Sequence, residues 1–387
     1  MTKALPDGSD TNRIATGDTD HIRCLNAQDW QPALREGGQI GLFEFWPTWL
    51  MYLPVVFDWL RLAAVHRSLS LPLLANPLLP VSGMVGVAKS ELMRQAVGKC
   101  DAAILPWIRY ETDDSSAQEQ ADVCLERVAR RSISFPFVCK PDIGCRGSGV
   151  KLIHNPGQLE QAISSYPRGA ALLCQKLANW EPEAGVFYVR DPATGKGEIV
   201  SLTFKYSPSV RGDGERTLAE LVAADKRAGA VLHLYRDRHR EHWHKVLPEG
   251  EKFRLVFSAS HCRGAVFRDA REHITPALTD AMHAILSDLP GYHYGRLDVK
   301  FRDIDSLRRG ETIEIVEING ASSESIHIWD KDTRLGDAIS TLLWQYRTLF
   351  KLGAHHREQG HQPPGLRALL RHWQIERALT RHYPSTD

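Results

Sequence analysis

The chain has 387 residues, of which 43% are hydrophobic and 25% charged, a composition typical of a soluble enzyme. Its formal net charge of +1 gives no overall field that would attract nucleic acid, so no nucleic-acid partner is expected. Seven cysteines at irregular spacing form no Cys-x-x-Cys pair. This pattern argues against a disulfide framework or a zinc site and fits a reducing, cytoplasmic location.

The first part of the chain is polar and then becomes rich in tryptophan. Residues 1–22 carry no apolar signal segment and are expected to be disordered. Residues 23–130 are expected to form a Trp-rich and helical region, with one helix over about 55–67. The uncharged apolar run 45–57 is shorter than the roughly 20 residues that span a bilayer, so we expect no membrane crossing there.

The aromatic residues of segment 43–62 leave two interpretations open. Packing against the protein core, or at a homodimer interface, is the commoner use of such side chains. Peripheral membrane contact, or a channel for a long apolar substrate, is the alternative. The side chains concerned are Phe43, Phe45, Trp46, Trp49, Tyr52, Phe57 and Trp59.

From residue 135 onward, short apolar runs bounded by turns alternate with single amphipathic helices. This order indicates an α+β fold and not a doubly wound parallel sheet. An earlier helix should begin near Lys89, with Ser90 as its cap. Strands are expected over 135–141, 150–153, 170–176, 185–190, 198–206, 255–259 and 265–267, and helices over 159–166, 217–229, 276–287 and 366–382.

Segment 140–150 reads Lys-Pro-Asp-Ile-Gly-Cys-Arg-Gly-Ser-Gly-Val and is the first with a chemical interpretation. Glycines let a backbone approach phosphate oxygens closely, and Lys140 would add a positive charge beside them. The segment is neither a Walker A loop nor a dinucleotide fingerprint, because a strand follows it where those motifs begin a helix. If segment 140–150 is considered alone, a flexible hairpin with a surface lysine explains its sequence as well as a phosphate-binding loop does.

Segment 205–218 contains Lys205 and the tight turn Gly212-Asp213-Gly214, followed by Thr217 where a helix cap belongs. A structural role for the turn is the favoured interpretation. Lys205 and Arg211 either face a phosphate or lie in solvent.

Two adjacent strands carry the strongest signal, with Arg296 and Asp298 on the first and Glu317 and Asn319 on the second. Residues two apart share a strand face, so each pair points the same way. Acids are disfavoured on strands, and Mg²⁺ prefers carboxylate and other oxygen ligands. The alternative is a structural salt bridge between Asp298 and Arg296.

In their order along the chain, these motifs resemble the ATP-grasp superfamily. The nearest branches are the D-alanine–D-alanine ligases and the cyanophycin and glutathione synthetases, and the resemblance covers roughly 87–332. It rests on Lys89-Ser90, on Phe137-Val138-Cys139-Lys140, on Gln175-Lys176-Leu177, on Gly212-Asp213-Gly214 with Thr217-Leu218, on Arg296-Leu297-Asp298 and on Glu317-Ile318-Asn319.

The resemblance implies two α+β lobes that grip ATP, preceded by an atypical Trp-rich region. It places a small lobe with a glycine-rich lid over 131–180, a large lobe with the metal site over 181–350, and a basic C-terminal helix over 351–387. Two departures from the family pattern stand out. Gln175 stands where the family usually has glutamate, which bears on adenine binding. The loop 320–325 replaces a Thr-x-Pro-Gly-like sequence that shapes the acceptor pocket, so D-alanine is not implied as the substrate.

Site residues follow from the same resemblance. Arg296 and Lys140 would be catalytic, and Asp298, Glu317 and Asn319 would be metal ligands. Lys89 matches a lysine before the early helix. The nucleotide would be held by Lys140 and the lid residues Gly144, Arg146, Gly147, Ser148 and Gly149, by the hinge residues Gln175, Lys176 and Leu177, by Glu183 at the ribose, and by Lys205.

The implied activity is that of an ATP-dependent carboxylate–amine ligase. Its partners would be ATP, a small carboxylate and a small amine, with two Mg²⁺ ions, or Mn²⁺, as the metal. The reaction would pass through an acylphosphate and release ADP and phosphate. A non-catalytic ATP-binding protein and a phosphotransferase on the same fold are the alternatives. The expected location is cytoplasmic, with membrane association through segment 43–62 as the variant.

Overall fold

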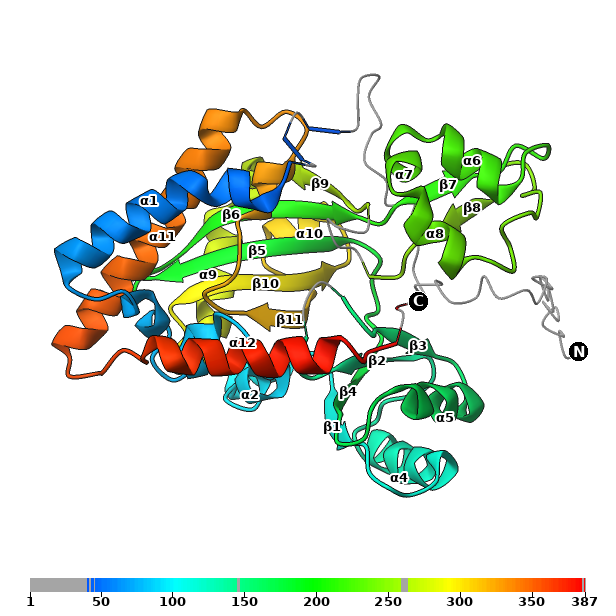
Figure 1. The fold of residues 1–387 in the computed structure, drawn as a ribbon, viewed down its shortest axis with the longest axis horizontal. Coiled ribbons are helices and arrows are strands. Elements are labelled where there is room, and N and C mark those ends of the chain that lie inside the picture. Colours follow the sequence, from blue (N-terminus) through cyan, green and yellow to red (C-terminus); the bar gives the residue numbers. More distant parts are fainter. Residues whose placement is uncertain are drawn as a thin grey trace, which may run out of the picture.

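A computed structural model describes residues 40–41, 43–44, 46–144, 147–258, 264–384 and 386 of the chain. This part is built around two antiparallel sheets that carry helices, with a smaller third unit beside them (Figure 1). The α+β class is therefore confirmed. The tail predicted over 1–22, and the side chains of Phe45 and Arg146, lie outside the described residues.

The smaller of the two sheets has four strands in the order β1-β4-β2-β3. Two helices cover one face of it and share an apolar core that includes Phe137, Leu159 and Cys174. The first of these helices is fixed at its start by a capping box, in which Ser116 and Glu119 each bond the other's backbone. The elements are β1 (Trp107–Glu111), α4 (Ala117–Arg130), β2 (Phe137–Pro141), β3 (Lys151–Ile153), α5 (Pro156–Ser165) and β4 (Ala171–Lys176).

The larger sheet has five strands in the order β11-β10-β5-β6-β9 and is covered on both faces. Alternation along β5 directs Val186 and Tyr188 toward α9, while Phe187 points to the opposite face against α11. The elements are α2 (Lys89–Met93), α3 (Gly98–Ala103), β5 (Glu183–Arg190), β6 (Gly197–Tyr206), β9 (Val266–Asp269), α9 (Pro276–Ser287), β10 (Tyr294–Phe301), α10 (Ile304–Arg308), β11 (Ile313–Asn319) and α11 (Leu335–Glu358).

The third unit lies at the right of Figure 1 and has its own small core around Leu218, Tyr235 and Phe253. The chain ends in a helix that runs from the α11 side of the molecule to the small sheet. These elements are β7 (Ser209–Arg211), α6 (Leu218–Ala224), α7 (Lys226–Ala230), α8 (Leu232–Arg238), β8 (Lys252–Arg254) and α12 (Leu366–Thr380).

Helix α1 (Thr48–His66) is longer than predicted and begins before Pro54, which lies inside it. Its inner face packs Met51 and Val55 against α11 and the turn 326–329. Among the described residues, α1 is the one helix long and apolar enough to cross a membrane. Length therefore does not exclude a membrane crossing here, contrary to the expectation from run 45–57.

Three local predictions were wrong. Ser90 does not cap α2, because its hydroxyl and its N–H both donate to the buried carboxylate of Asp142. The helix expected over 217–229 is two helices, because the Asp225 side chain accepts from two N–H groups and starts a new turn. Residues 255–258 are not a strand, because the Arg254 guanidinium donates hydrogen bonds to the carbonyls of Val256 and Phe257, which a neighbouring strand would otherwise use.

Strand β1, helix α8 and the 24-residue helix α11 were not predicted. Helix α11 contains residue 350, where the large lobe was expected to end. All of the domain limits stay predictions.

Candidate active site

A cleft of about 910 Å³ lies between the two sheets. The small sheet contributes Lys140 and Gln175 to its lining, and the large sheet contributes Arg296, Asp298 and Glu317. Side chains predicted from separate segments therefore meet in one cavity. Their binding roles stay predictions at this point.

Strands β10 and β11 bring the predicted metal ligands together. They pair antiparallel with Asp298 directly opposite Glu317 and Arg296 directly opposite Asn319. Directly opposed side chains on one sheet face lie about 4.5–5.5 Å apart at Cβ. The Asn319 amide is buried and its Nδ2 has no hydrogen-bond partner within the described residues. Buried polar groups are normally satisfied, so this amide fits a site that a ligand completes.

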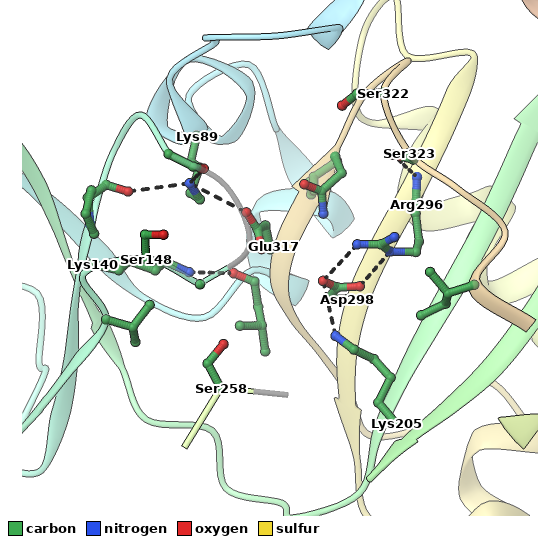
Figure 2. Close-up of a pocket in the computed structure, with 18 of the residues that line it drawn as sticks. Lys89, Lys140, Ser148, Lys205, Ser258, Arg296, Asp298, Glu317, Ser322 and Ser323 are labelled. Carbon is green, nitrogen blue, oxygen red and sulfur yellow. Dashed lines mark hydrogen bonds and ion pairs between the residues drawn. The ribbon is translucent and has the colours of Figure 1, made fainter. Parts of the chain in front are cut away.

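Asp298 is held between two cations. Arg296 Nε donates to its Oδ1 at 2.9 Å, and Lys205 Nζ lies 3.3 Å from its Oδ2 (Figure 2). Burial opposes the charge, but Arg296 and Lys205 outweigh it and lower the pKa of Asp298. The salt bridge that sequence offered as the alternative is thus present, and it keeps the carboxylate ionised as a metal ligand must be.

Glu183, the predicted ribose contact, is engaged by two lysines. Lys205 donates to one carboxylate oxygen in a short contact, and Lys300 Nζ lies 3.1 Å from the other. Burial opposes this charge too, yet the lysines lower the pKa of Glu183 to about 2. Lys205 in turn has a raised pKa, because Asp298 and Glu183 outweigh its burial. In this structure Glu183 orders the lysines of the cleft, and its ribose role stays a prediction.

Lys140 reaches from β2 across the cleft toward β11. Its Nζ donates to Gln175 Oε1 at 2.7 Å and to the Val316 carbonyl at 3.2 Å. Burial lowers the pKa of Lys140 to about 8, with Glu317 opposing that shift and Lys89 adding to it. Lys89 Nζ donates to the Gly144 carbonyl at 2.7 Å and lies 3.7 Å from Glu317 Oε1 (Figure 2).

The described lid residues Gly144, Gly147, Ser148 and Gly149 border this part of the cleft or lie next to it. Gly147 and Gly149 both have φ of +70°, a conformation that L side chains rarely adopt. A Cβ on Gly149 would also come within 2.9 Å of Pro141 Cγ. The backbone conformation at positions 147 and 149 therefore favours glycine over any other residue.

The end of the chain holds the lid, which the sequence did not suggest. Tyr383 Oη donates to the Ile143 carbonyl at 2.8 Å, and Thr386 Oγ1 donates to the Gly147 carbonyl at 2.5 Å. On α12, Glu376 lines the cleft and accepts from the Gly86 N–H at 2.6 Å.

The predicted hinge residues Gln175, Lys176 and Leu177 also line the cleft, at the end of β4. The Lys176 N–H donates to the Pro106 carbonyl at 2.8 Å, and Gln175 Nε2 donates to the Leu105 carbonyl at 3.4 Å. These bonds fix the hinge strand against the segment that leads into β1. Contact of the three hinge residues with adenine stays a prediction.

Glu324 is a cleft residue that sequence reasoning missed. It accepts a short hydrogen bond from Tyr52 Oη and one of 3.2 Å from Trp329 Nε1, both neutral donors. Within the described residues no cation lies in ion-pair distance of it, and burial raises its pKa. Its backbone carbonyl lies 3.4 Å from Arg296 NH1, which places it beside the Asp298 site. The signal available in the sequence was its position in the loop directly after Asn319.

The donor set defines how a metal would be held. In the described part of the chain there is no group of three or more His, Cys, Asp or Glu side chains arranged to hold an ion. The predicted set has two carboxylates and one amide, which suits Mg²⁺ held jointly with substrate phosphates and water. It does not suit a cage made of protein ligands alone.

Comparisons with known proteins give a loose structural likeness. No family model and no curated protein sequence matches the chain. Solved structures that match include a bifunctional glutathione synthetase from Pasteurella multocida, at 14% identity and TM-score 0.36 over 68% of this chain and 35% of that one. A D-alanine–D-alanine ligase from Bacillus anthracis matches at 12% identity and TM-score 0.38, over 70% of this chain and 69% of that one. D-cycloserine synthetase matches at 12% identity and TM-score 0.36, over 68% of this chain and 70% of that one.

The chain thus spans about a third of the glutathione synthetase. Similarity this low does not carry over an activity or a residue role. The function is therefore inferred from the residues of the cleft itself.

Proposed function

We propose that the chain is an ATP-dependent carboxylate–amine ligase that forms an amide bond. The observation that carries this proposal is the pairing of Asp298 with Glu317 and of Arg296 with Asn319, facing Lys140 across one cleft. Two acids, an unsatisfied amide and two cations in one cavity fit a magnesium–triphosphate and its transferred phosphoryl group.

Asp298, Glu317 and Asn319 would hold the Mg²⁺. When bound, Mg²⁺ neutralises charge on the phosphate oxygens. Lys140 and Arg296 would contact those oxygens from the two sides of the cleft. Both lie where negative charge develops during phosphoryl transfer, so they stabilise the transition state more than the ground state.

In the first step, a substrate carboxylate oxygen attacks the γ-phosphorus and ADP leaves, which gives an acylphosphate. In the second step, an amine nitrogen attacks the acyl carbon, loses a proton, and expels phosphate as the amide forms. Water would destroy the acylphosphate. The described lid residues Gly144, Gly147 and Ser148 line the cleft, the lid is bonded by Tyr383 and Thr386, and it would exclude water from the bound phosphates.

Glu324 favours a ligase over a simple phosphotransferase. A buried carboxylate supported only by neutral donors is unfavourable unless a cation joins it. An ammonium substrate at this position would supply the missing charge, and Glu324 would then accept a proton from it before attack. The raised pKa of Glu324 suits that second role. The hydroxyl substrate of a phosphotransferase carries no positive charge, so it would not balance the carboxylate charge of Glu324.

The test is ADP release from Mg-ATP over a panel of carboxylate and amine pairs, including amino acids and fatty acids, with mass spectrometry of the product. Asp298→Asn should lower turnover about 10²- to 10³-fold, the loss expected for one charge-stabilising contact in a transition state. Glu324→Gln should raise the KM for the amine while ATP affinity is unchanged. Asp305→Asn, an exposed acid on α10, is the matched control.

The outcomes separate the alternatives. ADP release with a phosphorylated product and no amide would establish the phosphotransferase. Binding of an ATP analogue with no turnover across the panel would establish a non-catalytic ATP-binding protein. Normal turnover of Asp298→Asn would refute the site itself.

A further inference from the structure

The outward surface of α1 is a continuous apolar ridge. We define the α1 ridge as Trp49, Leu53, Val56, Phe57 and Leu60, which recur at helical spacing and so share one face. Trp49, Phe57 and Leu60 are 68%, 65% and 55% exposed. Apolar side chains scattered singly on a surface are normal, but a contiguous exposed set marks an interaction site.

The ridge is separate from the packing that holds α1 in place. Met51 and Val55 fill the inner face against α11, and Tyr52 reaches Glu324 in the cleft. The ridge side chains take no part in the buried clusters of the described residues. Folding of this part of the chain therefore does not explain why the outward face is apolar.

The charges at the edge of the ridge are positive. Arg61 and Arg347 both pair with the one carboxylate of Asp58, at 2.8 and 2.6 Å, so this group carries a net charge of +1. Both guanidinium groups are more than half exposed, while Asp58 is buried. Arg67 follows the helix end and is exposed. An apolar surface bordered by arginines is complementary to a layer of anionic headgroups over acyl chains.

We propose that the α1 ridge binds the surface of an anionic lipid membrane, with α1 lying in the plane of the interface. Trp49 and Phe57 enter the boundary between headgroups and acyl chains, and Arg61, Arg347 and Arg67 contact the headgroups. The helix does not cross the bilayer, because crossing would separate it from α11 and expose the Asp58 ion pairs to hydrocarbon. This proposal does not depend on the activity of the cleft.

Thr48, the first residue of α1, and Trp46, which precedes the helix, both line the cleft, and Tyr52 of α1 is hydrogen-bonded to Glu324 there. A membrane bound by the ridge would therefore lie near this part of the cleft.

The test is flotation of the full-length protein with vesicles of phosphatidylcholine alone or mixed with phosphatidylglycerol. We expect binding to the mixed vesicles, weakened by high salt. Trp49→Ser/Phe57→Ser should lower the partition coefficient at least about tenfold, since two exposed side chains lose their transfer to an apolar phase. Val123→Ser/Val246→Ser, at two exposed valines outside α1, on α4 and beside Thr217, should bind like the wild type.

Circular dichroism and thermal unfolding of each variant check that the fold is retained. Equal vesicle binding by wild type and Trp49→Ser/Phe57→Ser would overturn the proposal. So would a wild type that fails to float while sedimenting as a dimer that the double substitution separates, because the ridge would then bind a second copy.

Discussion

Lys140 gives the sharpest test of the phosphate site, because its charge should titrate near neutral pH. Its Nζ donates to Gln175 Oε1 and to the Val316 carbonyl in the wall of the cleft, and burial lowers its pKa to about 8. Lysine in water has a pKa near 10.4, so few lysines change charge in this range. If Lys140 contacts ATP phosphates, the affinity for ATP must follow its protonation.

The expected size of the effect follows from that pKa. With a value of about 8, Lys140 is about nine-tenths protonated at pH 7 and about one-tenth protonated at pH 9. Phosphate binding requires the charged form, so the apparent Kd should rise about tenfold over this interval, or ~1.4 kcal/mol. The direction of the change in Kd is fixed, because Lys140 loses its positive charge as pH rises through its pKa. Binding at pH 9 should also take up a proton.

Isothermal titration calorimetry with a non-hydrolysable ATP analogue and Mg²⁺, in buffers of different ionisation enthalpy, measures both the Kd and the proton uptake. Lys140→Arg keeps the charge at every pH and should lose the pH dependence. Lys196→Met removes an exposed lysine whose pKa is raised by Glu198, and it should behave as the wild type. A wild-type Kd that is equal at pH 7 and pH 9 would refute the role of Lys140, as would a tenfold rise that persists in Lys140→Arg.

Three further predictions concern stability and are measured by urea unfolding. Burial, with nearby arginine charge, lowers the pKa of His293 and His327 to about 4, so both are neutral when folded, and stability should be lost as pH falls from about 6.5 toward 4. A midpoint unchanged between pH 7 and pH 5 would contradict this. Asn76→Ala should destabilise the protein by roughly 3 kcal/mol, because the side chain satisfies buried backbone groups of His293 and Tyr294 at the start of β10; Asn76→Asp should not restore stability at neutral pH, because it buries a carboxylate against the Tyr294 carbonyl to which Nδ2 donates. Thr217→Ala should cost about 1 kcal/mol through its lost capping box, and a change within error would mean that α6 is held by packing alone.

Local sequence patterns predicted much of the fold, because helix caps and helix or strand periodicity depend on residues that are close together in the chain. The run 276–287 has Thr275 as cap and a proline in its first turn, and α9 spans Pro276–Ser287 as expected. Thr217 likewise caps a helix as predicted. Where a side chain competes with the backbone the prediction failed, as at Asp225 and Arg254, because nothing in a periodic pattern shows where such a side chain bonds.

The candidate site divides in the same way. The two-residue period of a strand is enough to place Arg296 with Asp298, and Glu317 with Asn319. Pairing of the two strands in register is not determined by that period, and it is what sets Asp298 opposite Glu317. The environment of Lys140 also depends on the approach of two separate sheets.

The sequence by itself determined the chemical content of the cleft, since residue types and their order along strands are local properties. Only the tertiary structure decided which distant groups meet there. Tyr52 and Glu324 are 272 positions apart, and Tyr383 lies 240 positions beyond Ile143, yet each pair is hydrogen-bonded. Packing also decided which face of α1 is covered by α11 and which is left apolar and exposed, because a helix with apolar residues on more than one face contains little signal of which side its neighbour will occupy.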